Sequence, residues 1–340
     1  MAAVNAMVLA AGLGTRLRPL TYEIPKPMVP VLDRPVMAHI IDLLDRHGIE
    51  RVIANLHWFP DTIKGYFGER LSYRYEPELL GTAGGVRNCS DFFGDESFLV
   101  ISGDALTDID LDRFARRHRE SGGIATLAVK PVADTREYGV VLHVAGGRIS
   151  GFQEKPDPAE ALSNLGNCGI YMFEPEIFDH FPAADPVDWA NDVFPALLEA
   201  DVPFHIHELE EYWNDIGSLD ELRQGTFDAL TGELGLAVEG ERVADGYIVG
   251  QGSSLDGVAM VEPPVWIGRD VRVGDHARLQ GPLVIGDGAR IGDSALLRGS
   301  IVFPGSELAD ETILIGAIAG RAGIVESLRP RPAPATRGRG

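Results

Sequence analysis

Residues 5–30 read NAMVLAAGLGTRLRPLTYEIPKPMVP, a short apolar run followed by a long loop rich in glycine, arginine and proline. The apolar run at Ala6–Leu9 predicts a buried β-strand. A loop that follows such a strand lies at the carboxyl edge of the sheet, where open α/β sheets bind their ligands. Gly12 and Gly14 would let backbone N–H groups approach a phosphate closely. The stretch therefore predicts an α/β fold whose first loop binds an anion.

Two common phosphate-binding loops do not fit this stretch. A dinucleotide-binding loop needs a third glycine and an immediate helix, but Leu17 stands at the third position and Pro19 forbids an early helix. The glycine-rich loop that ends in Gly-Lys-Ser/Thr is also absent from the sequence. What remains is two guanidinium groups, Arg16 and Arg18, and Lys26 between two prolines. An arginine fork and a lysine point charge can hold a triphosphate from different sides.

The chain up to about residue 230 alternates short apolar runs with longer segments of helical period, which predicts a sheet with crossover helices. A helix is expected after Asp33 as N-cap, with Pro35 in its first turn and Gly48 as its stop. A second helix is expected at Leu111–Ser121, and Asp108 and Asp110 are interpreted as a turn and a helix start. Further strands are expected at Arg51–Asn55, Ser72–Glu76, Phe98–Ser102 and Ile124–Val129.

After about residue 246 every sixth residue is apolar, which is the signature of a parallel β-helix. We therefore expect a first domain over residues 1–230, a linker over 231–246, a β-helix over 247–326 and a disordered basic tail over 327–340. The tail, SLRPRPAPATRGRG, contains no acidic residue and too little apolar surface to fold alone. The repeat residues are Val249, Leu255, Val261, Ile267, Val273, Leu279, Ile285, Ile291, Leu297, Phe303, Ala309 and Ile315.

Composition excludes several classes of protein. The 30 lysines and arginines stand against 51 acidic residues, a net charge of 30 − 51 = −21, so we expect neither nucleic acid nor anionic lipid as a partner. No apolar run approaches the ~18 residues of a membrane span. The two cysteines, Cys89 and Cys168, form no disulfide framework. With an N-terminus that makes a poor signal peptide, these features lead us to expect a cytoplasmic protein.

The motif Gly12-x-Gly14-Thr15-Arg16-Leu17-x-Pro19, followed by Pro25-Lys26-Pro27, resembles the signature of the sugar-1-phosphate nucleotidyltransferases. Among their members, the chain most resembles bacterial mannose-1-phosphate guanylyltransferases. The resemblance implies a Rossmann-like sheet with a C-terminal left-handed parallel β-helix, in which three hexapeptides form one coil. The other matching motifs are LGTAGG at 80–85, SGD at 102–104, EYGV at 137–140, EKP at 154–156, NCGIY at 167–171 and WNDIG at 213–217.

This resemblance implies a reaction in which a sugar-1-phosphate oxygen attacks the α-phosphorus of a nucleoside triphosphate and expels pyrophosphate. It implies that Asp104 and Asp215 hold Mg2+, a hard cation that prefers oxygen ligands. Arg16 would stabilise charge on the phosphates, Lys26 would hold the triphosphate, and Lys155 would meet the sugar phosphate. The other expected nucleotide-binding residues are Ala10, Ala11, Gly12, Gly14, Thr15, Gly81, Thr82 and Gly103. Those expected around the sugar, besides Lys155, are Gly139, Glu154, Asn167 and Tyr171.

The base is expected to be guanine. Family members that use dTTP or UTP place a glutamine where this chain has Gly84. A carboxylate can pair with guanine N1–H and N2–H2 together, and Glu76 or Glu78 lies just before the loop. The sequence therefore favours GTP and mannose-1-phosphate as substrates.

Three alternatives remain open at this point, and we expect a homo-oligomer in each case. One is thymidylyl or uridylyl transfer to glucose-1-phosphate. Another is a catalytically silent homologue that binds a nucleotide sugar and regulates a partner, although all the charged motif residues are present. The third is an acyltransferase that uses His276 as its base. His205 and His207 share one strand face, and with no third metal ligand near them they are interpreted as part of a half-exposed strand.

Overall fold

A computed structural model describes residues 4–236, 240–255, 257–258, 260–320 and 323–326. The chain divides into two compact units, Met1–Val29 with Arg34–Gly217, and Pro30–Asp33 with Ser218–Gly340. These compact units divide after Gly217, whereas the sequence predicts a first domain that extends to residue 230. The reason is that helix α7 (Leu219–Thr231) packs within the second unit, where Arg223 donates to the Gly316 carbonyl at 3.0 Å. The expected basic tail, residues 327–340, lies outside the described residues.

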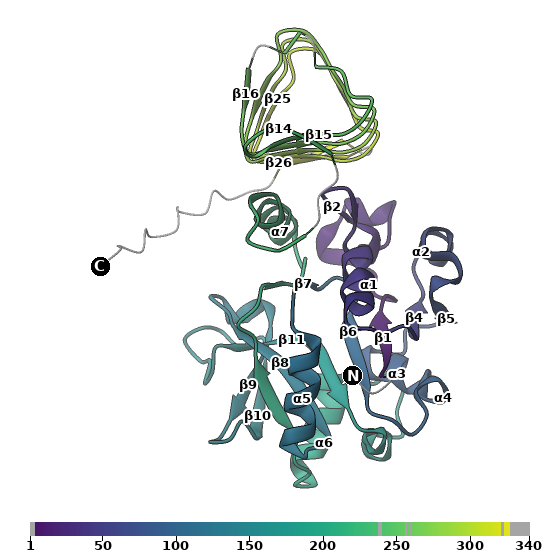
Figure 1. Ribbon diagram of the computed structural model, residues 1–340. Coiled ribbons are helices and arrows are strands. Elements are labelled where there is room, and N and C mark those ends of the chain that lie inside the picture. Colours follow the sequence, from purple (N-terminus) through teal and green to yellow (C-terminus); the bar gives the residue numbers. More distant parts are fainter. Residues whose placement is uncertain (1–3, 237–239, 256, 259, 321–322, 327–340) are drawn as a thin grey trace. The chain divides into compact units, whose positions relative to one another are not determined.

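The first unit is built on a 9-stranded mixed sheet, drawn in purple to teal in Figure 1. Its main path runs β10-β9-β11-β6-β1-β4-β5, with β8 beside β11 and β12 beside β8. The four strands β6, β1, β4 and β5 are parallel, and β11 joins them antiparallel. The strands are β1 (Asn5–Leu9), β4 (Val52–Leu56), β5 (Ser72–Tyr75), β6 (Phe98–Ser102), β8 (Ala125–Pro131), β9 (Gly139–His143), β10 (Ile149–Glu154), β11 (Leu165–Phe173) and β12 (His205–Glu208).

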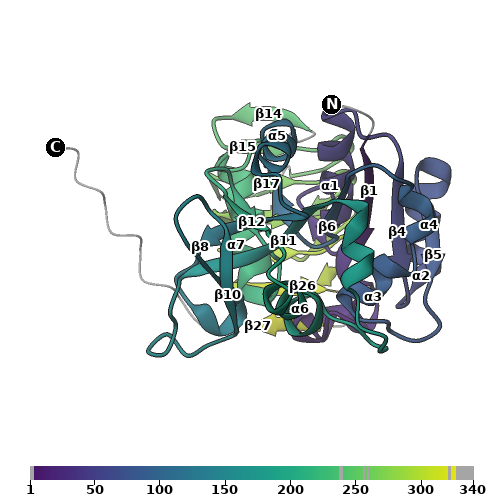
Figure 2. The same ribbon diagram turned by 90° about the horizontal axis from the view of Figure 1, so that it is seen from below.

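Helices cover both faces of this sheet, as Figures 1 and 2 show. They are α1 (Val36–Arg46), α2 (Pro60–Phe67), α3 (Thr82–Arg87), α4 (Ser90–Phe93), α5 (Leu111–Ser121) and α6 (Phe194–Glu199). Short 3-10 turns and one π-turn complete the unit at Thr15–Leu17, Leu20–Tyr22, Lys26–Met28, Gly68–Arg70, Thr135–Glu137, Pro175–His180 and Trp189–Val193. Minor strands are β2 (Pro30–Val31), which belongs to the second unit, and β3 (Arg34–Pro35), β7 (Leu106–Thr107) and β13 (Trp213–Asn214).

Two cores form because side chains alternate along the buried strands. In β1, Val8 joins the core with α1 and α5, while Met7 joins the opposite core with the aromatic side chains. In β6, Ile101 and Phe98 divide in the same way. Every strand expected from the sequence is present, and Phe98–Ser102 has the predicted bounds. Among the described residues, no helix is long and apolar enough to cross a membrane.

The first helix begins later than the sequence predicted. Arg34–Pro35 is extended, so α1 starts at Val36 with Pro35, not Asp33, as its N-cap. The ψ of Pro35 is 144°, outside the helical range. The chain leaves the helix at Gly48, whose φ of 71° suits glycine. The helix at Leu111–Ser121 has the predicted bounds, and Asp110 caps it by accepting from the Arg113 amide at 2.9 Å.

The second unit contains the expected β-helix, whose three parallel sheets form a triangular coil in Figure 1. One sheet is β15 (Tyr247–Val249), β17 (Val265–Ile267), β20 (Leu283–Ile285), β23 (Ile301–Val302) and β26 (Ala317–Gly320). The second is β16 (Met260–Glu262), β19 (Arg278–Gln280), β22 (Leu296–Arg298) and β25 (Ile313–Ile315). The third is β18 (Arg272–Val273), β21 (Arg290–Ile291) and β24 (Glu307–Leu308). The expected linker contains β14 (Glu241–Ala244), which pairs antiparallel with β15, and β27 (Gly323–Glu326) pairs antiparallel with β26.

The repeat shortens by one residue in its last coils. Ile285 aligns with Ile267, 18 residues earlier, whereas Val302 aligns with Ile285, 17 residues earlier. The stacked interior positions are therefore Val302, Leu308 and Leu314, and the assignment of Phe303, Ala309 and Ile315 to them is corrected. Leu314 is 1% exposed, while Ile315 is 58% exposed.

This shift predicts a large loss of stability for one substitution and almost none for its neighbour. Leu314→Ala should lower the free energy of unfolding by about 2–5 kcal/mol, because it leaves a cavity in the stacked interior. Ile315→Ala should change it by less than about 0.5 kcal/mol, because that side chain is largely exposed. Calorimetric and urea unfolding of the two full-length variants measures the difference. Equal destabilisation by both would contradict the assigned register.

Candidate active site

A cavity of about 220 Å³ opens at the carboxyl ends of β1 and β6. It brings together sequence motifs that lie far apart in the chain. Nine of the residues expected to bind substrate or metal line it, namely Arg16, Lys26, Thr82, Asp104, Gly139, Glu154, Asn167, Tyr171 and Asp215. The cavity is also lined by residues that the sequence analysis did not assign, including Glu137, Tyr138, Asp188, Trp189 and Trp213.

The glycine-rich loop folds tightly against Lys26. Gly14 has a φ of 61°, and a Cβ at this position would lie 2.8 Å from the Cβ of Lys26. Only glycine tolerates both conditions. The Thr21 hydroxyl donates to the Gly14 carbonyl at 2.8 Å, and the Ala10 amide donates to Asn55 Oδ1 at 2.8 Å. Ala10, Ala11, Gly12 and Thr15 thus belong to the loop that borders the cavity without lining it.

Lys26 joins this loop to the Asp104 carboxylate and to the backbone of Asp215. Its ammonium forms an ion pair with Asp104 and donates to the Asp215 backbone carbonyl at 3.4 Å. Asp104 reaches this position because the Gly103 amide donates to the Leu9 carbonyl at 2.9 Å. A Cβ on Gly103 would lie 2.7 Å from that carbonyl oxygen, so a small residue is required there. The ends of β1 and β6 therefore fix Asp104 beside Lys26.

Asp215 is the more buried carboxylate. Burial raises the pKa of Asp215, the negative charge of Asp104 raises it further, and Lys26 and Arg16 lower it. Asp215 Oδ1 accepts from the Tyr138 hydroxyl at 3.3 Å and from the Gly217 amide at 3.2 Å. Two carboxylates that repel each other and present oxygen ligands fit a divalent cation, which would favour the ionised form of both.

Arg16 lies at the mouth of the cavity. Its guanidinium donates to Glu137 at 2.7 Å, and a second nitrogen lies 4.0 Å from Asp215 Oδ2. The side chain is 47% exposed, so it is accessible to a ligand. A guanidinium in this position presents several donors to phosphate oxygens.

The cavity lining also contains several hydrogen-bonding groups that belong to other strands. Asn167 Nδ2 donates to the Tyr171 hydroxyl at 2.9 Å, and the Gly169 amide donates to Asn167 Oδ1 at 3.1 Å. Burial raises the pKa of Tyr171, so its hydroxyl stays protonated. Gly139 leaves room for Glu154, because a Cβ there would lie 2.9 Å from Glu154 Oε2. These groups suit hydroxyl recognition.

Lys155 does not line the cavity but lies next to it. Its backbone has a φ of 46°, unusual for a lysine, and its ammonium lies 3.4 Å from Glu154 Oε1. The side chain is 52% exposed. The structure thus places a flexible cation beside the hydroxyl-binding groups of the cavity.

Asp188, which the sequence analysis missed, also lines the cavity. Its Oδ2 accepts from the Thr82 hydroxyl at 2.6 Å. The Ala83 and Gly84 amides both donate to the Val187 carbonyl at 3.0 Å. Gly81 has a φ of 81°, and a Cβ there would lie 2.3 Å from the same carbonyl oxygen. No local sequence signal predicts this contact, because Thr82 and Asp188 are 106 residues apart.

Glu76 has a different role from the one expected. It is 1% exposed, and its Oε1 accepts from Asn55 Nδ2 at 2.8 Å while its Oε2 accepts from the Leu80 amide at 3.3 Å. Both oxygens therefore accept hydrogen bonds from groups within the protein, and the interpretation of Glu76 as a guanine-binding group is corrected. Glu78 is exposed, so it alone of the two carboxylates remains accessible.

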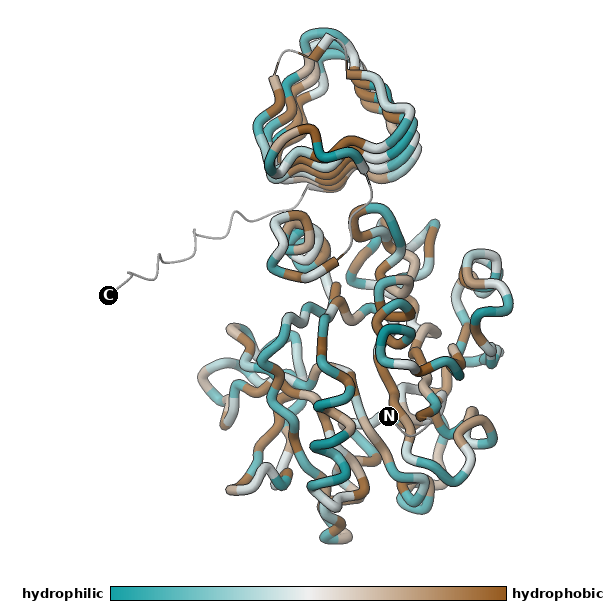
Figure 3. Tube along the Cα trace, in the orientation of Figure 1, coloured by the Kyte–Doolittle hydropathy of each residue, from teal (hydrophilic) through white to brown (hydrophobic). Residues whose placement is uncertain are grey.

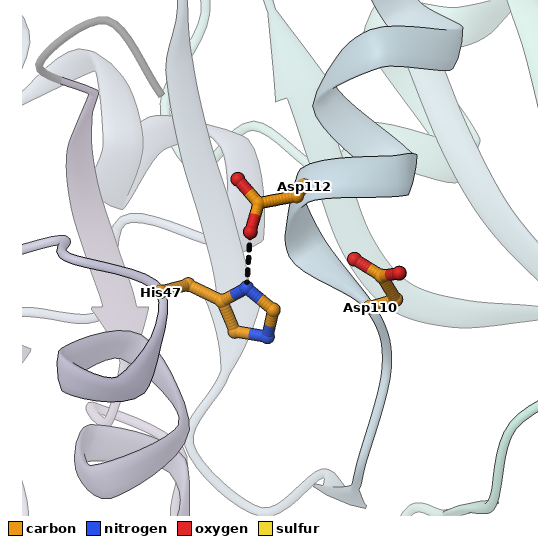
Figure 4. Close-up of side chains that lie close together, drawn as sticks. All are labelled: His47, Asp110 and Asp112. Atoms are coloured by element: carbon orange, nitrogen blue, oxygen red, sulfur yellow. Dashed lines mark hydrogen bonds and ion pairs between the residues drawn. The ribbon is translucent and has the colours of Figure 1, made fainter.

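Figure 4 shows another cluster of possible metal ligands, whose residues do not line the cavity. Within the described part of the chain, His47, Asp110 and Asp112 could together hold an ion. His47 Nδ1 lies 3.0 Å from Asp112, and Asp110 caps α5, so these carboxylates already have structural partners. Asp108 accepts from the Tyr212 amide at 2.8 Å, a contact between segments that are 104 residues apart, and the structure has no turn at this residue.

Comparison with known proteins gives consistent matches. The family described as "Nucleotidyl transferase" matches residues 5–231. A UTP–glucose-1-phosphate uridylyltransferase of Synechocystis sp. is 37% identical over 298 residues, covering 81% of this chain and 76% of that protein. A mannose-1-phosphate guanylyltransferase of Mycobacterium tuberculosis is 32% identical over 290 residues, covering 81% and 78%. A crystal structure of a putative glucose-1-phosphate thymidylyltransferase from Bacillus anthracis superposes with a TM-score of 0.62 at 22% identity, covering 70% of this chain and 98% of that one, and so shares the fold.

The structural role of Glu76 generates a stability prediction. Glu76→Ala should lower the free energy of unfolding by about 1–3 kcal/mol, because it leaves Asn55 Nδ2 and the Leu80 amide without their buried acceptor. Glu78→Ala, an exposed control on the same loop, should change it by less than about 0.5 kcal/mol. Urea unfolding of both variants provides the measurement. A stable Glu76→Ala variant would show that the carboxylate does not hold the loop.

Proposed function

The chain belongs to the nucleotidyl transferase family, and from this premise we propose that it transfers a nucleotidyl group from a nucleoside triphosphate to a sugar-1-phosphate, releasing pyrophosphate. The observation that carries the proposal is that one cavity contains two sets of groups with different chemistry. Arg16 and Lys26 lie with Asp104 and Asp215. Asn167, Tyr171 and Glu154 supply hydroxyl-binding groups in the lining of the same cavity.

The charged groups of the cavity are suited to the triphosphate. Lys26 would exchange part of its contact with Asp104 for phosphate oxygens, and Arg16 would stabilise the negative charge that develops on the leaving pyrophosphate. Asp104 and Asp215 would hold a divalent cation, proposed as Mg2+, which supplies charge neutralisation at the phosphates. Phosphoryl transfer of this kind depends on positioning and electrostatics, so no covalent nucleophile is required from the protein.

The hydroxyl-binding groups of the cavity are suited to the sugar-1-phosphate. Glu154 would accept hydrogen bonds from sugar hydroxyls, together with the Gly139 backbone and Asn167. Lys155, exposed beside Glu154, would contact the sugar phosphate. Tyr171 is hydrogen-bonded to Asn167 and would orient that amide. This assignment places the attacking phosphate between the two sets of groups.

GTP and mannose-1-phosphate are the proposed substrate pair. Gly84 offers no side-chain amide to a pyrimidine, and the exposed Glu78 carboxylate can pair with guanine N1–H and N2–H2. The mycobacterial relative carries this activity in its name. A second candidate is UTP with glucose-1-phosphate, which the name of the Synechocystis relative favours at 37% identity.

A cytoplasmic homo-oligomer is the proposed form of the enzyme. Nucleoside triphosphates are cytoplasmic substrates, and Cys89 and Cys168 are both buried and free. Burial raises the pKa of Cys89 to about 11, so this thiol is unreactive at neutral pH.

The substrate pair can be identified from pyrophosphate release across four nucleoside triphosphates and a panel of sugar-1-phosphates with Mg2+. GTP with mannose-1-phosphate should give the highest kcat/KM. Glu78→Gln should narrow the preference for GTP over UTP by roughly tenfold, since a bidentate contact to a base contributes about 1–3 kcal/mol. Glu69→Gln serves as the exposed control. A maximum with UTP and glucose-1-phosphate would favour the second candidate, and no release with any pair would overturn the proposal.

The metal site can be tested with Asp104→Asn and Asp215→Asn. Each should lower kcat by roughly 10²-fold or more, because the triphosphate loses its cation. Mg2+ should raise the Tm of the unsubstituted chain but not of these variants, since a ligand stabilises only the state that binds it. Asp112→Asn, which removes an exposed carboxylate elsewhere, is the matched control. Full activity of Asp104→Asn would refute its metal role.

A further inference from the structure

A second cavity, of about 350 Å³, lies in the first unit and shares no lining residue with the reaction cavity. We call it the α5 pocket. Helix α5 and strand β12 form most of its wall. The lining residues with charged or titratable side chains are Arg113, Arg116, Arg117, Glu120, His207 and Glu208. None of them belongs to a motif that the proposed function has used.

Three arginines on α5 give the pocket a positive wall. Arg113, Arg116 and Arg117 have the spacing that places side chains on one side of a helix. Arg113 is held by Glu210 at 3.0 Å. Arg116 and Arg117 are exposed, and neither side chain has an ion pair or hydrogen bond with the described residues. Figure 3 shows α5 as largely hydrophilic. In a chain of net charge −21, two arginines without partners at one cavity form a local exception.

His207 supplies an independent observation. It is 6% exposed and lines the pocket, and its buried Nε2 has no hydrogen-bond partner among the described residues. Buried polar atoms are normally paired. Burial lowers the pKa of His207, and the charges of Arg113 and Arg117 lower it further. The imidazole is therefore neutral, and its side chain forms part of the pocket wall.

The carboxylates in the wall narrow the ligand class. A bare phosphate would meet Glu120 and Glu208 as well as the arginines, and these two groups would repel it. A ligand that carries hydroxyl groups beside its phosphate would satisfy both kinds of side chain. Carboxylates accept hydrogen bonds from hydroxyls, while guanidinium groups bind phosphate oxygens.

We propose that the α5 pocket is a second binding site for a sugar phosphate, separate from the reaction cavity. Arg116 and Arg117 bind its phosphate, His207 forms part of the wall beside it, and Glu120 and Glu208 accept from its hydroxyls. The sheet connects the site to the reaction cavity. Glu208 in β12 pairs with Val129 in β8, and Val129 pairs with Asn167 in β11.

The test titrates glucose-6-phosphate, which has no anomeric phosphate, into the full chain by calorimetry. Lys26→Ala/Lys155→Ala weakens phosphate binding in the reaction cavity, and Lys155→Ala alone is a second background because that side chain is exposed. Saturable binding should persist in both backgrounds. Adding Arg116→Gln/Arg117→Gln should weaken it at least tenfold. Arg119→Gln, an exposed arginine of the same helix that does not line the pocket, should leave it unchanged.

A second titration, with pyrophosphate in place of glucose-6-phosphate, tests the class of ligand separately from the existence of the site. Weaker binding of pyrophosphate supports a site for sugar phosphates, whereas tighter binding overturns that ligand class. Absence of binding in both backgrounds, or binding insensitive to Arg116→Gln/Arg117→Gln, overturns the site itself. The titration measures binding directly, so its result is independent of whether the chain releases pyrophosphate.

Discussion

The contact of Lys26 with Asp104 and Asp215 is the interaction on which the site depends. The two carboxylates come from segments more than a hundred residues apart, and each would be unfavourable alone in a partly buried position. The Lys26 ammonium forms an ion pair with the Asp104 carboxylate and donates to the backbone carbonyl of Asp215, and its charge lowers the pKa of the Asp215 carboxyl. It also holds the loop after β1 closed, because Gly14 packs directly on the Lys26 side chain. The charged groups of Lys26 and Asp104 therefore stabilise the fold when no ligand is bound.

The sheet makes this contact possible by bringing chain ends to one edge. Strands β1 and β6 are neighbours in register from Asn5 and Phe98 to Leu9 and Ser102. The loops that follow them must then start side by side, so the glycine-rich loop and Asp104 need no further element to meet. The antiparallel strand β11 brings Asn167 and Tyr171 to the same cavity. The fold thus brings the charged groups and the hydroxyl-binding groups to one cavity without a dedicated domain for each.

Sequence reasoning located the elements whose signal is local. Apolar runs between turn residues identified the strands, and the motifs identified nine residues of the cavity lining. It failed where a role depends on a distant partner. Glu76 is buried because Asn55 and the Leu80 amide need an acceptor, and Asp188 matters because it binds Thr82. The shortened coil could not be predicted for another reason. Phe303, Ala309 and Ile315, which the six-residue repeat places in the interior, are apolar like the residues that occupy the interior in the structure.

The last strand of the β-helix changes direction. Each parallel coil leaves an unpaired edge on which another coil could stack, so the repeat contains no stop signal of its own. Strand β27 pairs antiparallel with β26 from Ala317 to Gly320 and occupies that edge. A hairpin strand cannot template the next turn of a parallel coil, because its hydrogen-bonding direction is reversed. Strand β27 therefore covers the free edge that β26 would otherwise present in this sheet.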